Sequence, residues 1–506
     1  MRYHLLSTHS ASAHSTAATL TAQSQICSRP ALRLLPLTLA VCLALSPLST
    51  VAAAANEQPD TEQAESSVET IRVNGKRLQQ STPGRMPLTA REIPQSISEV
   101  SAELMAAANM IDINDVMMNV PGVNVTLFDT QRPLYFARGF QITDFQVDSI
   151  PTYSGSTNQE YDTALYERIE VIRGGSSVLW GDGASAGVIN VVIKHGPATG
   201  ESARLLAAVE SFRGWELSAS GQRTMGAWTL DVQGKKLRTD GYRENSYLHQ
   251  DSAGLGIQWN DGPWAVSWRV LSEDQSTGLP GALKLADAQN DPRQSDTPND
   301  YDERRETRHL ARVTWRGENV RLELDAGYRY RETGYEYVSP GSSKAESSSD
   351  QWQLSPRVVW SQEFEASSWS VTGGVDWLDW DYDSASSFLQ ETGSQHNLAA
   401  YAQSELALPT DTRVLMGLRH ERVEKSAVSS SSNYTRNDKL EAGELGVSQG
   451  LIGPWSVYGR VASSYRLANI DENRYTPGSA PLVPRENREQ ERGLRWEQGG
   501  DSVTAR

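Results

Sequence analysis

Residues 183–187, Gly-Ala-Ser-Ala-Gly, match the G-x-S-x-G pattern in which a serine on a sharp turn acts as a nucleophile. That chemistry needs a strand before the serine, a helix after it, and histidine and acidic partners. Here an alternating apolar run, 188–193, follows and predicts a strand where the pattern needs a helix. The sequence therefore argues against a catalytic Ser185.

Other residues that could support chemistry also lack the required spacing. His420-Glu421 is not followed by the second histidine of a zinc-binding helix, and no Lys-Ser/Thr pair follows the glycines as in a phosphate-binding loop. The aspartates of residues 287–302 could bind Ca²⁺, but their spacing misses the EF-hand pattern and favours a solvated acidic loop. We predict no enzyme activity, no metal site and no resident cofactor.

The composition limits the class of protein. A net charge of −16 and an isoelectric point near 5.1 argue against nucleic acid as a partner. Beyond the N-terminal region no apolar run is long enough for a transmembrane helix, so a membrane location would require a β-barrel. The 14 Trp and 18 Tyr, against 7 Phe, suit aromatic girdles at two membrane interfaces.

The N-terminal region predicts export. Basic residues precede the apolar run 34–45, and small residues at 51–55 suit a signal peptidase, so we place the mature start near Asn56. Both cysteines, Cys27 and Cys42, lie in the predicted signal peptide. The mature chain would therefore cross an oxidising periplasm without forming wrong disulfides.

The most informative stretch is 164–197, where an alternating apolar run, a glycine-rich loop and a second alternating run follow one another. Upstream lie Asn-Val-Pro-Gly-Val-Asn-Val at 119–125, Arg-Gly-Phe at 138–140 and Phe-Gln-Val-Asp at 145–148. In this order and spacing, these segments resemble the plug domain of TonB-dependent outer-membrane receptors, particularly the ferric-siderophore branch. The resemblance covers residues 68–198.

This resemblance implies an all-β fold with a small α+β plug. The plug would fill the lumen of an antiparallel transmembrane β-barrel, for which the family uses 22 strands. The expected parts are a signal peptide (1–55), a periplasmic arm (56–83), a plug domain (84–198) and a partial barrel (199–506).

The arm contains an isolated strand-like run that resembles the TonB box of the family. An unpaired strand can add to the edge of a partner's sheet, which lets the partner pull on it. A linker with β propensity is the alternative, but the position before a plug-like domain favours the box. About a dozen residues precede it in the mature chain, so we expect transport without a transcriptional signalling domain. The predicted box residues are Val68, Glu69, Thr70, Ile71, Arg72 and Val73.

Within the plug, residues 101–120 predict one or two helices with Ser101 as an N-cap, after an extended lead-in. Strands are expected near 123–126, 135–138 and 146–148. The glycines between 174 and 187 predict a turn whose backbone must approach its neighbours closely.

Arg138 and Arg173 each precede a glycine. In the resembled family, the plug arginines of such motifs pair with barrel glutamates, and Glu491 matches one of these glutamates by the pattern around it. Buried arginines need such partners, because an unpaired buried charge is very costly. We predict a plug lock formed by Arg138, Arg173 and Glu491; ordinary surface arginines are the alternative.

After Gly200 the sequence alternates with a period of two, as at Trp228, Leu230 and Val232, which is typical of a barrel with apolar residues toward lipid. A soluble sandwich could alternate too, but rarely shows regular asymmetry between its short and long connections. The connections at 225–226, 260–263, 316–319 and 409–412 are short, and those at 274–306, 335–350, 383–396 and 426–438 are long and polar. We expect the short ones in the periplasm and the long ones outside.

About fourteen strands of roughly ten residues fit between 202 and 500, and the chain ends as another strand, 502–504, begins. Residues 465–470 and 484–493 resemble a mid-barrel segment of the family. We therefore expect a C-terminally truncated receptor, from a fragmentary sequence or an interrupted gene. A complete barrel with fewer strands is the alternative, but a barrel must close.

The resemblance implies a receptor and transporter in the outer membrane of a Gram-negative cell, surrounded by lipid and lipopolysaccharide. It would bind a ferric siderophore, carry iron only within that ligand, and draw energy from TonB and its inner-membrane complex. Other scarce ligands (haem, cobalamin, another chelate) and a non-functional truncated remnant are the alternatives, and a passive porin would need neither plug nor box. The expected ligand-binding residues are Phe128, Gln131, Arg132, Tyr153, Tyr301 and Tyr335, with Tyr242, Tyr247 and Tyr337 as further loop candidates.

Overall fold

The structure is a computed structural model. It describes residues 92–110, 112–127, 133–153, 166–193, 200–338, 343–387, 389–429, 433–474, 476, 481–498 and 501–505. The predicted signal peptide and TonB box lie outside these residues, as do Phe128, Gln131 and Arg132. Among the described helices, none is both long and apolar enough to cross a membrane.

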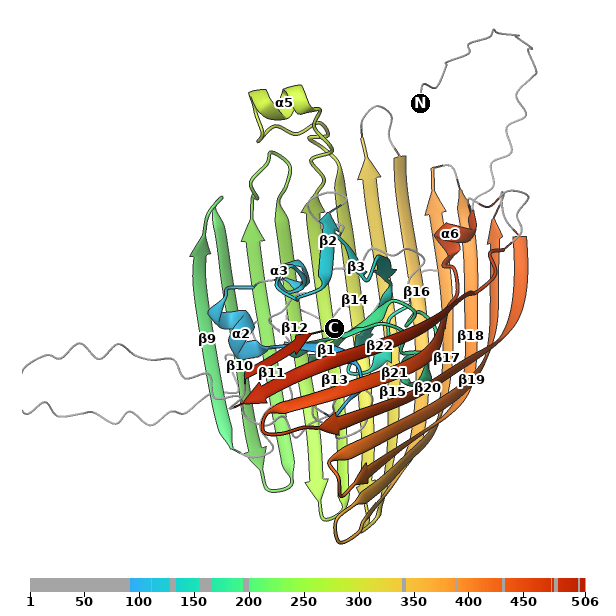
Figure 1. Ribbon diagram of the computed structural model, residues 1–506. Helices are drawn as coiled ribbons and strands as arrows, with labels where there is room; N and C mark the ends of the chain where they lie inside the picture. The colour runs from blue at the N-terminus through green and yellow to red at the C-terminus, as the bar shows by residue number, and fades with distance from the viewer. Residues whose placement is uncertain are drawn as a thin grey trace, which may run out of the picture. The chain divides into compact units, whose positions relative to one another are not determined.

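The N-terminal part, the plug, combines two small sheets with short helices (Figure 1). The first sheet has the order β1-β7-β8-β5-β6, and the second has the order β2-β3-β4. The strands of the first sheet are β1 (Ser96–Ser101), β5 (Asp144–Val147), β6 (Ile150–Pro151), β7 (Tyr166–Arg173) and β8 (Gly187–Ile193). The remaining elements are β2 (Val123–Leu127), β3 (Pro133–Ala137), β4 (Phe140–Ile142), α2 (Ala102–Ala107), α3 (Ile113–Met118) and α4 (Ser177–Trp180).

The predicted helices and strands of the plug are confirmed with small shifts of their ends. Ser101 caps α2, because its Oγ accepts a hydrogen bond from the Leu104 backbone N–H at 3.3 Å. β7 and β8 pair antiparallel and carry fully buried apolar side chains such as Val171 and Ile189. These strands form the centre of the plug core.

β1 is an edge strand of the plug sheet and places two acidic residues opposite each other. Glu99 pairs directly with Glu170 of β7, and Glu170 accepts hydrogen bonds from Arg168 Nε at 2.8 Å and Asn190 Nδ2 at 2.9 Å. Burial raises the pKa of Glu99 to about 7; the charge of Arg168 opposes this shift and that of Glu170 adds to it. We therefore expect the stability of the β1–β7 pairing to depend on pH.

We predict that β1 becomes easier to detach as the pH rises. The raised pKa means that folding favours protonated Glu99, so its stabilising contribution is full below about pH 4.5 and is lost as the pH rises through about 7. Between pH 6 and pH 8, the free energy of opening measured by hydrogen exchange of β1 amides should fall by about 1 kcal/mol. Glu99→Gln should show no such fall, and an equal fall in that variant would refute the assignment.

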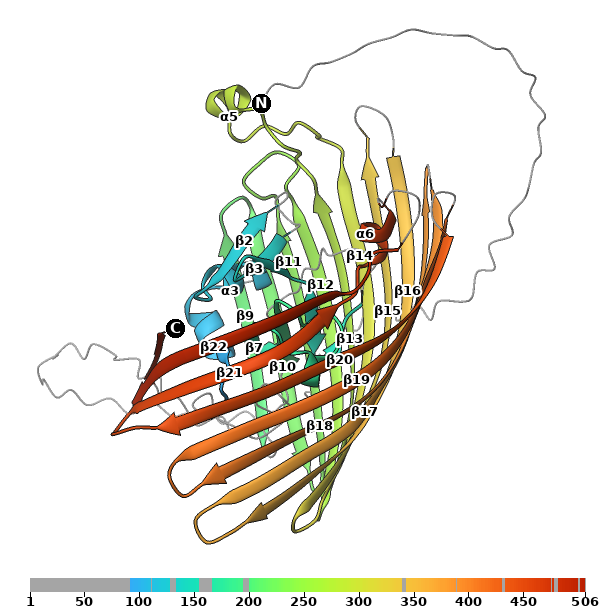
Figure 2. The same cartoon turned by 45° about the vertical axis from the view of Figure 1, so that its right-hand side comes forward.

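Most of the remaining described chain forms one antiparallel sheet, the wall, in which each strand pairs with the next in sequence (Figures 1 and 2). The sheet curves around the plug, which contacts its inner face. Its strands are β9 (Glu201–Glu210), β10 (Gly214–Met225), β11 (Trp228–Thr239), β12 (Leu248–Asp261), β13 (Trp264–Gly278), β14 (Tyr301–Arg316), β15 (Val320–Tyr337), β16 (Ser343–Glu363), β17 (Ser368–Ser386), β18 (Gln390–Leu408), β19 (Thr412–Ser429), β20 (Asn433–Gly450), β21 (Trp455–Arg466), β22 (Arg485–Gln498) and β23 (Asp501–Ala505). A short helix, α6 (Ile470–Arg474), lies in the connection between β21 and β22. β9 to β22 are the fourteen strands expected from the sequence.

Alternation along the wall strands separates an apolar face from a polar one. On β11, Trp228 is 53% exposed while the next residue, Thr229, is 3% exposed. On β15, Leu322 is exposed on the outer face, and Asp325 is buried on the inner face. The predicted alternation is confirmed: apolar side chains point outward and polar ones point toward the plug.

The predicted strand length of about ten residues was wrong for much of the wall. The predicted long loops at 335–350, 383–396 and 426–438 are mostly paired strand, because β16 has 21 residues and its neighbours are nearly as long. Beyond the lipid both faces of a hairpin meet water, so the period-two signal disappears while the backbone hydrogen bonds continue. The connection 279–300 is long as predicted, and it contains α5 (Leu285–Asn290).

Candidate functional site

Arg138 lies in a two-residue turn of the plug, and its side chain contacts the wall. Ala137 pairs with Phe140, so Arg138 and Gly139 form the turn of the β3–β4 hairpin, with φ of 53° and 83°. Positive φ at both positions is the pattern of a type I′ turn, which suits glycine but strains arginine. The contacts that Arg138 makes at the wall hold it in this conformation.

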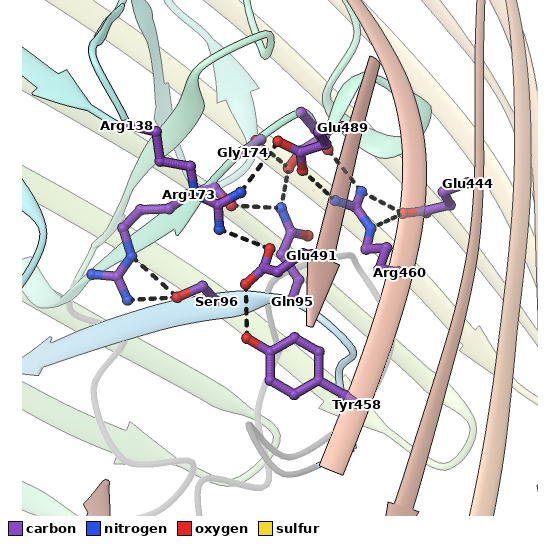
Figure 3. Close-up of polar contacts among 12 residues, drawn as sticks. Gln95, Ser96, Arg138, Arg173, Gly174, Glu444, Tyr458, Arg460, Glu489 and Glu491 are labelled. Atoms are coloured by element: carbon purple, nitrogen blue, oxygen red, sulfur yellow. Dashed lines mark hydrogen bonds and ion pairs between the residues drawn. The ribbon is translucent and has the colours of Figure 1, made fainter. Parts of the chain in front are cut away.

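Two glutamates of β22 receive the Arg138 guanidinium (Figure 3). Nη2 lies 2.7 Å from Glu491 Oε2, and Nη1 lies 3.2 Å from Glu489 Oε2. The two glutamates are two residues apart on one strand, so both face the plug. Burial lowers the pKa of Arg138, but the hydrogen bond and charge of Glu491, with the charge of Glu489, raise it above its ordinary value overall. Arg138 therefore stays charged.

Wall residues hold both glutamates in place. Tyr458 donates a hydrogen bond from its hydroxyl to Glu491 Oε1 at 2.7 Å, and Arg460 Nη1 lies 3.0 Å from Glu489 Oε1. Arg460 also contacts Glu444 Oε2 at 2.6 Å and donates to the carbonyl of Gly175 in the plug at 2.7 Å. Positive and negative groups thus alternate across β20, β21, β22 and the plug, which compensates the buried charges. We call Arg138, Glu444, Tyr458, Arg460, Glu489 and Glu491 the Arg138 cluster.

The structure brings Arg138 and Glu491 together but places Arg173 differently. Arg173 Nη2 donates to Ser96 Oγ at 3.0 Å, and its Nη1 donates to the carbonyl of Pro121. These contacts lie within the plug and join the end of β7 to β1 and to the loop before β2. We expected Arg173 to pair with a barrel glutamate, but these hydrogen bonds join it to other plug residues. The reason is the β1–β7 register, which places Arg173 opposite Ser96.

The glycine after Arg173 contributes to the site through its missing side chain. Gly174 has a φ of 91°, and a Cβ at this position would lie 2.4 Å from Glu489 Oε1 and 2.7 Å from Arg138 Nη1. Gly175 is equally crowded, because its Cβ would lie 2.3 Å from Ser464 Oγ. The prediction of close backbone approach in the glycine-rich loop is confirmed. Within the same loop, Ser185 precedes the strand β8, as expected from the sequence.

A second contact between plug and wall surrounds a recess of about 560 Å³, including space open to solvent, toward the end of the wall that carries the longer connections. Tyr153, Trp380, Lys425 and Arg466 are among its lining residues. Asp182 of the plug also lines it and accepts hydrogen bonds from the Leu467 N–H at 2.8 Å, Gln395 Nε2 at 3.2 Å and the Tyr153 hydroxyl at 3.4 Å. Burial raises the pKa of Asp182 to about 6.

Of the predicted ligand-binding residues, Tyr153 lines this recess. Tyr301 and Tyr335 lie on β14 and β15, where Tyr301 donates to Glu336 Oε2 at 3.0 Å and the ring of Tyr335 packs 4.8 Å from that of Tyr337. Neither belongs to the described lining of the recess. Within the described part of the chain, no three His, Cys, Asp or Glu side chains gather as a metal site.

Several site residues were not predicted: Glu444, Tyr458, Arg460 and Glu489 of the Arg138 cluster, and Asp182, Trp380, Lys425 and Arg466 at the recess. Glu489 had a usable signal, since it precedes the predicted Glu491 by two residues and so shares its face of the strand. The other wall residues are brought into place by pairing between strands, and Asp182 by packing of the plug loop after α4 against the wall; one sequence reveals neither.

Comparison with protein families gives two matches. The profile described as TonB-dependent Receptor Plug Domain matches residues 89–188, and the profile described as TonB dependent receptor-like, beta-barrel matches residues 269–506. Together they match more than half of the chain.

The curated relatives include receptors for ferric pyoverdines and a hemin receptor of Yersinia enterocolitica. The chain is 41% identical over 119 residues to the ferripyoverdine receptor of Pseudomonas aeruginosa, an alignment that covers 22% of this chain and 14% of that receptor. It is 27% identical over 176 residues to the ferric-pyoverdine BN7/BN8 receptor of Pseudomonas putida, covering 33% of this chain and 22% of the relative. These alignments therefore span less than a quarter of each relative's length.

Solved structures share the fold over a larger part of the chain. FpvA of P. aeruginosa, bound to a heterologous pyoverdine with iron, superposes with a TM-score of 0.72 at 18% identity, covering 83% of this chain and 63% of that one. The ferric yersiniabactin uptake receptor FyuA of Yersinia pestis gives 0.70 at 18% identity, covering 80% and 70%. At this identity the likeness establishes the fold alone.

Proposed function

Because the chain belongs to the TonB-dependent receptor family, we propose that it acts in the outer membrane as a receptor for a ferric siderophore. The observation that carries the proposal is the Arg138 cluster, which holds a separate plug against the inner face of the wall through compensated charges. Ion pairs of this kind fix the plug in one position and yet can be broken without breaking covalent bonds. A plug held in this way suits a barrel whose opening to a ligand is regulated. The iron would be carried through as part of the siderophore ligand.

The recess beside Tyr153 supports a chelate as the ligand. Trp380 and Tyr153 offer aromatic surface, and Lys425 and Arg466 offer positive charge to an anionic iron complex. Arg466 also pairs with Glu472 at 2.7 Å, and Asp182 lies in the same lining, so an incoming anion would compete with these carboxylates. Relatives named as ferripyoverdine receptors make ferric pyoverdine the first ligand to test. TonB and its inner-membrane complex would supply the energy through the predicted TonB box at 68–73.

The test is uptake of ⁵⁵Fe-labelled ferric pyoverdine by a host without siderophore receptors of its own, with and without TonB. We expect accumulation only in the TonB-containing host. Ile71→Pro should reduce it at least tenfold but leave ligand binding at the cell surface intact, since proline prevents strand addition. Gln79→Pro, in the same arm but outside the box, is the matched control.

Equal accumulation with and without TonB would contradict the proposed energy coupling. Haem and cobalamin are tested in the same hosts. Uptake of either one in place of ferric pyoverdine would support TonB-dependent transport but show that the ligand is a different one. Absence of surface binding for all three probes would overturn the receptor function.

A further inference from the structure

Residues 92–95, the lead segment, connect the preceding chain to β1 and are held by arginines of the wall. Arg495 Nη1 donates to the carbonyl of Ile93 at 2.7 Å, and its Nη2 donates to the carbonyl of Gln95. Arg413 Nη2 lies 2.5 Å from Glu92 Oε1. Any displacement of the chain before Glu92 reaches the plug through this segment, so these contacts are the first to be disturbed.

The arginine that holds the lead segment also contacts the Arg138 cluster. The Arg495 guanidinium lies 4.3 Å from the centroid of the Tyr458 ring, within range of a cation–π interaction. The hydroxyl of Tyr458 donates to Glu491 Oε1, and Glu491 holds Arg138 at 2.7 Å (Figure 3). An unbroken line of contacts therefore runs from the lead segment to Arg138.

The geometry of β22 explains why this line is continuous. Glu491, Gly493 and Arg495 are two residues apart, so they share the inner face of the strand. Tyr458 pairs with Gly493 across β21 and β22, and a Cβ on Gly493 would lie 2.1 Å from Tyr458 Cε1. The Tyr458 ring therefore lies over Gly493, between the glutamate that binds Arg138 and the arginine that binds the lead segment.

We propose that Arg495 and Tyr458 are positioning residues that couple the lead segment to the Arg138 cluster. Displacing residues 92–95 removes the carbonyls that accept hydrogen bonds from Arg495, so its guanidinium is held less firmly against the Tyr458 ring. A less firmly held Tyr458 in turn weakens the hydrogen bond from its hydroxyl to Glu491, the carboxylate that binds Arg138. All three wall side chains are at most 7% exposed, so water does not replace these contacts at low cost. That a pull on the preceding chain displaces the lead segment rests on the proposed function. The coupling between the lead segment and the Arg138 cluster does not depend on that function.

The test is hydrogen exchange of the purified chain in detergent micelles, without ligand or TonB. Tyr458→Phe keeps the ring and removes only the hydroxyl; Arg495→Leu removes the contacts to the lead segment. Each variant should speed exchange about fivefold at two places, the lead segment with the start of β1 and the β3–β4 hairpin that carries Arg138. Tyr434→Phe is the matched control, because that buried tyrosine accepts a hydrogen bond from Asn473 Nδ2 at 3.0 Å, away from the Arg138 cluster.

Purely local effects would overturn the proposal: faster exchange only near residues 93–97 in Arg495→Leu and only near 137–140 in Tyr458→Phe. A double-mutant cycle between Arg495→Leu and Arg138→Leu gives a second criterion, since coupled sites give non-additive changes and independent sites give additive ones. If Arg495→Leu does not fold, Gly493→Ala, which displaces the Tyr458 ring, serves in its place. None of these readouts involves uptake, so failure here leaves the proposed function standing, and failure of uptake leaves the coupling testable.

Discussion

Arg138→Leu is expected to lower the free energy of plug opening by about 3 kcal/mol, or to speed exchange of the most protected plug amides about 100-fold. The reason is that the substitution leaves the buried Glu491 carboxylate without its cation. The Glu491 side chain is 4% exposed and would keep one hydrogen bond, from Tyr458, without a cation in contact at 2.7 Å. Leaving one member of a buried ion pair uncompensated costs more than the pair itself contributes.

The charge explanation can be separated from simple loss of packing. Arg138→Leu combined with Glu491→Gln removes the uncompensated charge and should recover more than half of the loss, since Arg460 continues to pair with Glu489. Arg213→Leu is the control, because Arg213 is 88% exposed in its pair with Asp240 and its loss should change stability by less than about 0.5 kcal/mol. If the double variant is no more stable than Arg138→Leu, the charge explanation fails.

Gly174→Ala is expected to have an effect of similar size, about 3 kcal/mol, although it adds only one methyl group. The added carbon would occupy the space between Glu489 Oε1 and Arg138 Nη1, and the positive φ of 91° adds backbone strain. The Arg138 contact with Glu489 would have to open. The expected result is faster exchange in the β3–β4 hairpin and in β7, at unchanged secondary-structure content by circular dichroism.

Gly226→Ala separates strain from steric conflict. Gly226 also has a positive φ, 63°, but a Cβ there would meet nothing within 4 Å, so that variant should lose only about 1 kcal/mol. Pairing Gly174→Ala with Glu489→Ala removes the nearest atoms and should restore part of the stability. Equal losses for Gly174→Ala and Gly226→Ala would show that backbone strain alone determines the effect.

The sequence predicted the general plan of the site better than its contacts. The resemblance placed Arg138 and Glu491 in one lock, and the structure holds them 2.7 Å apart. The same reasoning gave Arg173 an equivalent position because it also precedes a glycine. The two motifs differ in backbone: Arg138 lies in a hairpin turn, whereas Arg173 ends a strand beside Ser96. A short motif does not encode that difference.

The wall shows a related limit. Strands were predicted where apolar and polar residues alternate, and this succeeds along β11, whose outer face is apolar. It fails at the tips of the β15–β16, β17–β18 and β19–β20 hairpins, since the pairing continues there without an apolar face. Periodicity reports the environment of side chains, and the backbone pairing can extend beyond the region where that environment changes.

Cross-strand neighbours could not be predicted at all. Tyr458 reaches Glu491 only because β21 and β22 pair with Tyr458 opposite Gly493. A shift of one residue in this register would turn the tyrosine to the other face of the sheet. The residues that hold the Arg138 cluster in place therefore become visible only when the register is known.

The wall half of the Arg138 cluster has a consequence for any displacement of Arg138 from the wall. Glu489 is held by Arg460 and Glu491 by Tyr458, and none of these four residues belongs to the plug. The ion pair between Arg460 and Glu489 therefore stays assembled on the wall when Arg138 leaves, and little conformational entropy is lost in this part of the acceptor when the arginine comes back. Such a preorganised acceptor favours return of Arg138 to the closed arrangement without refolding of the wall.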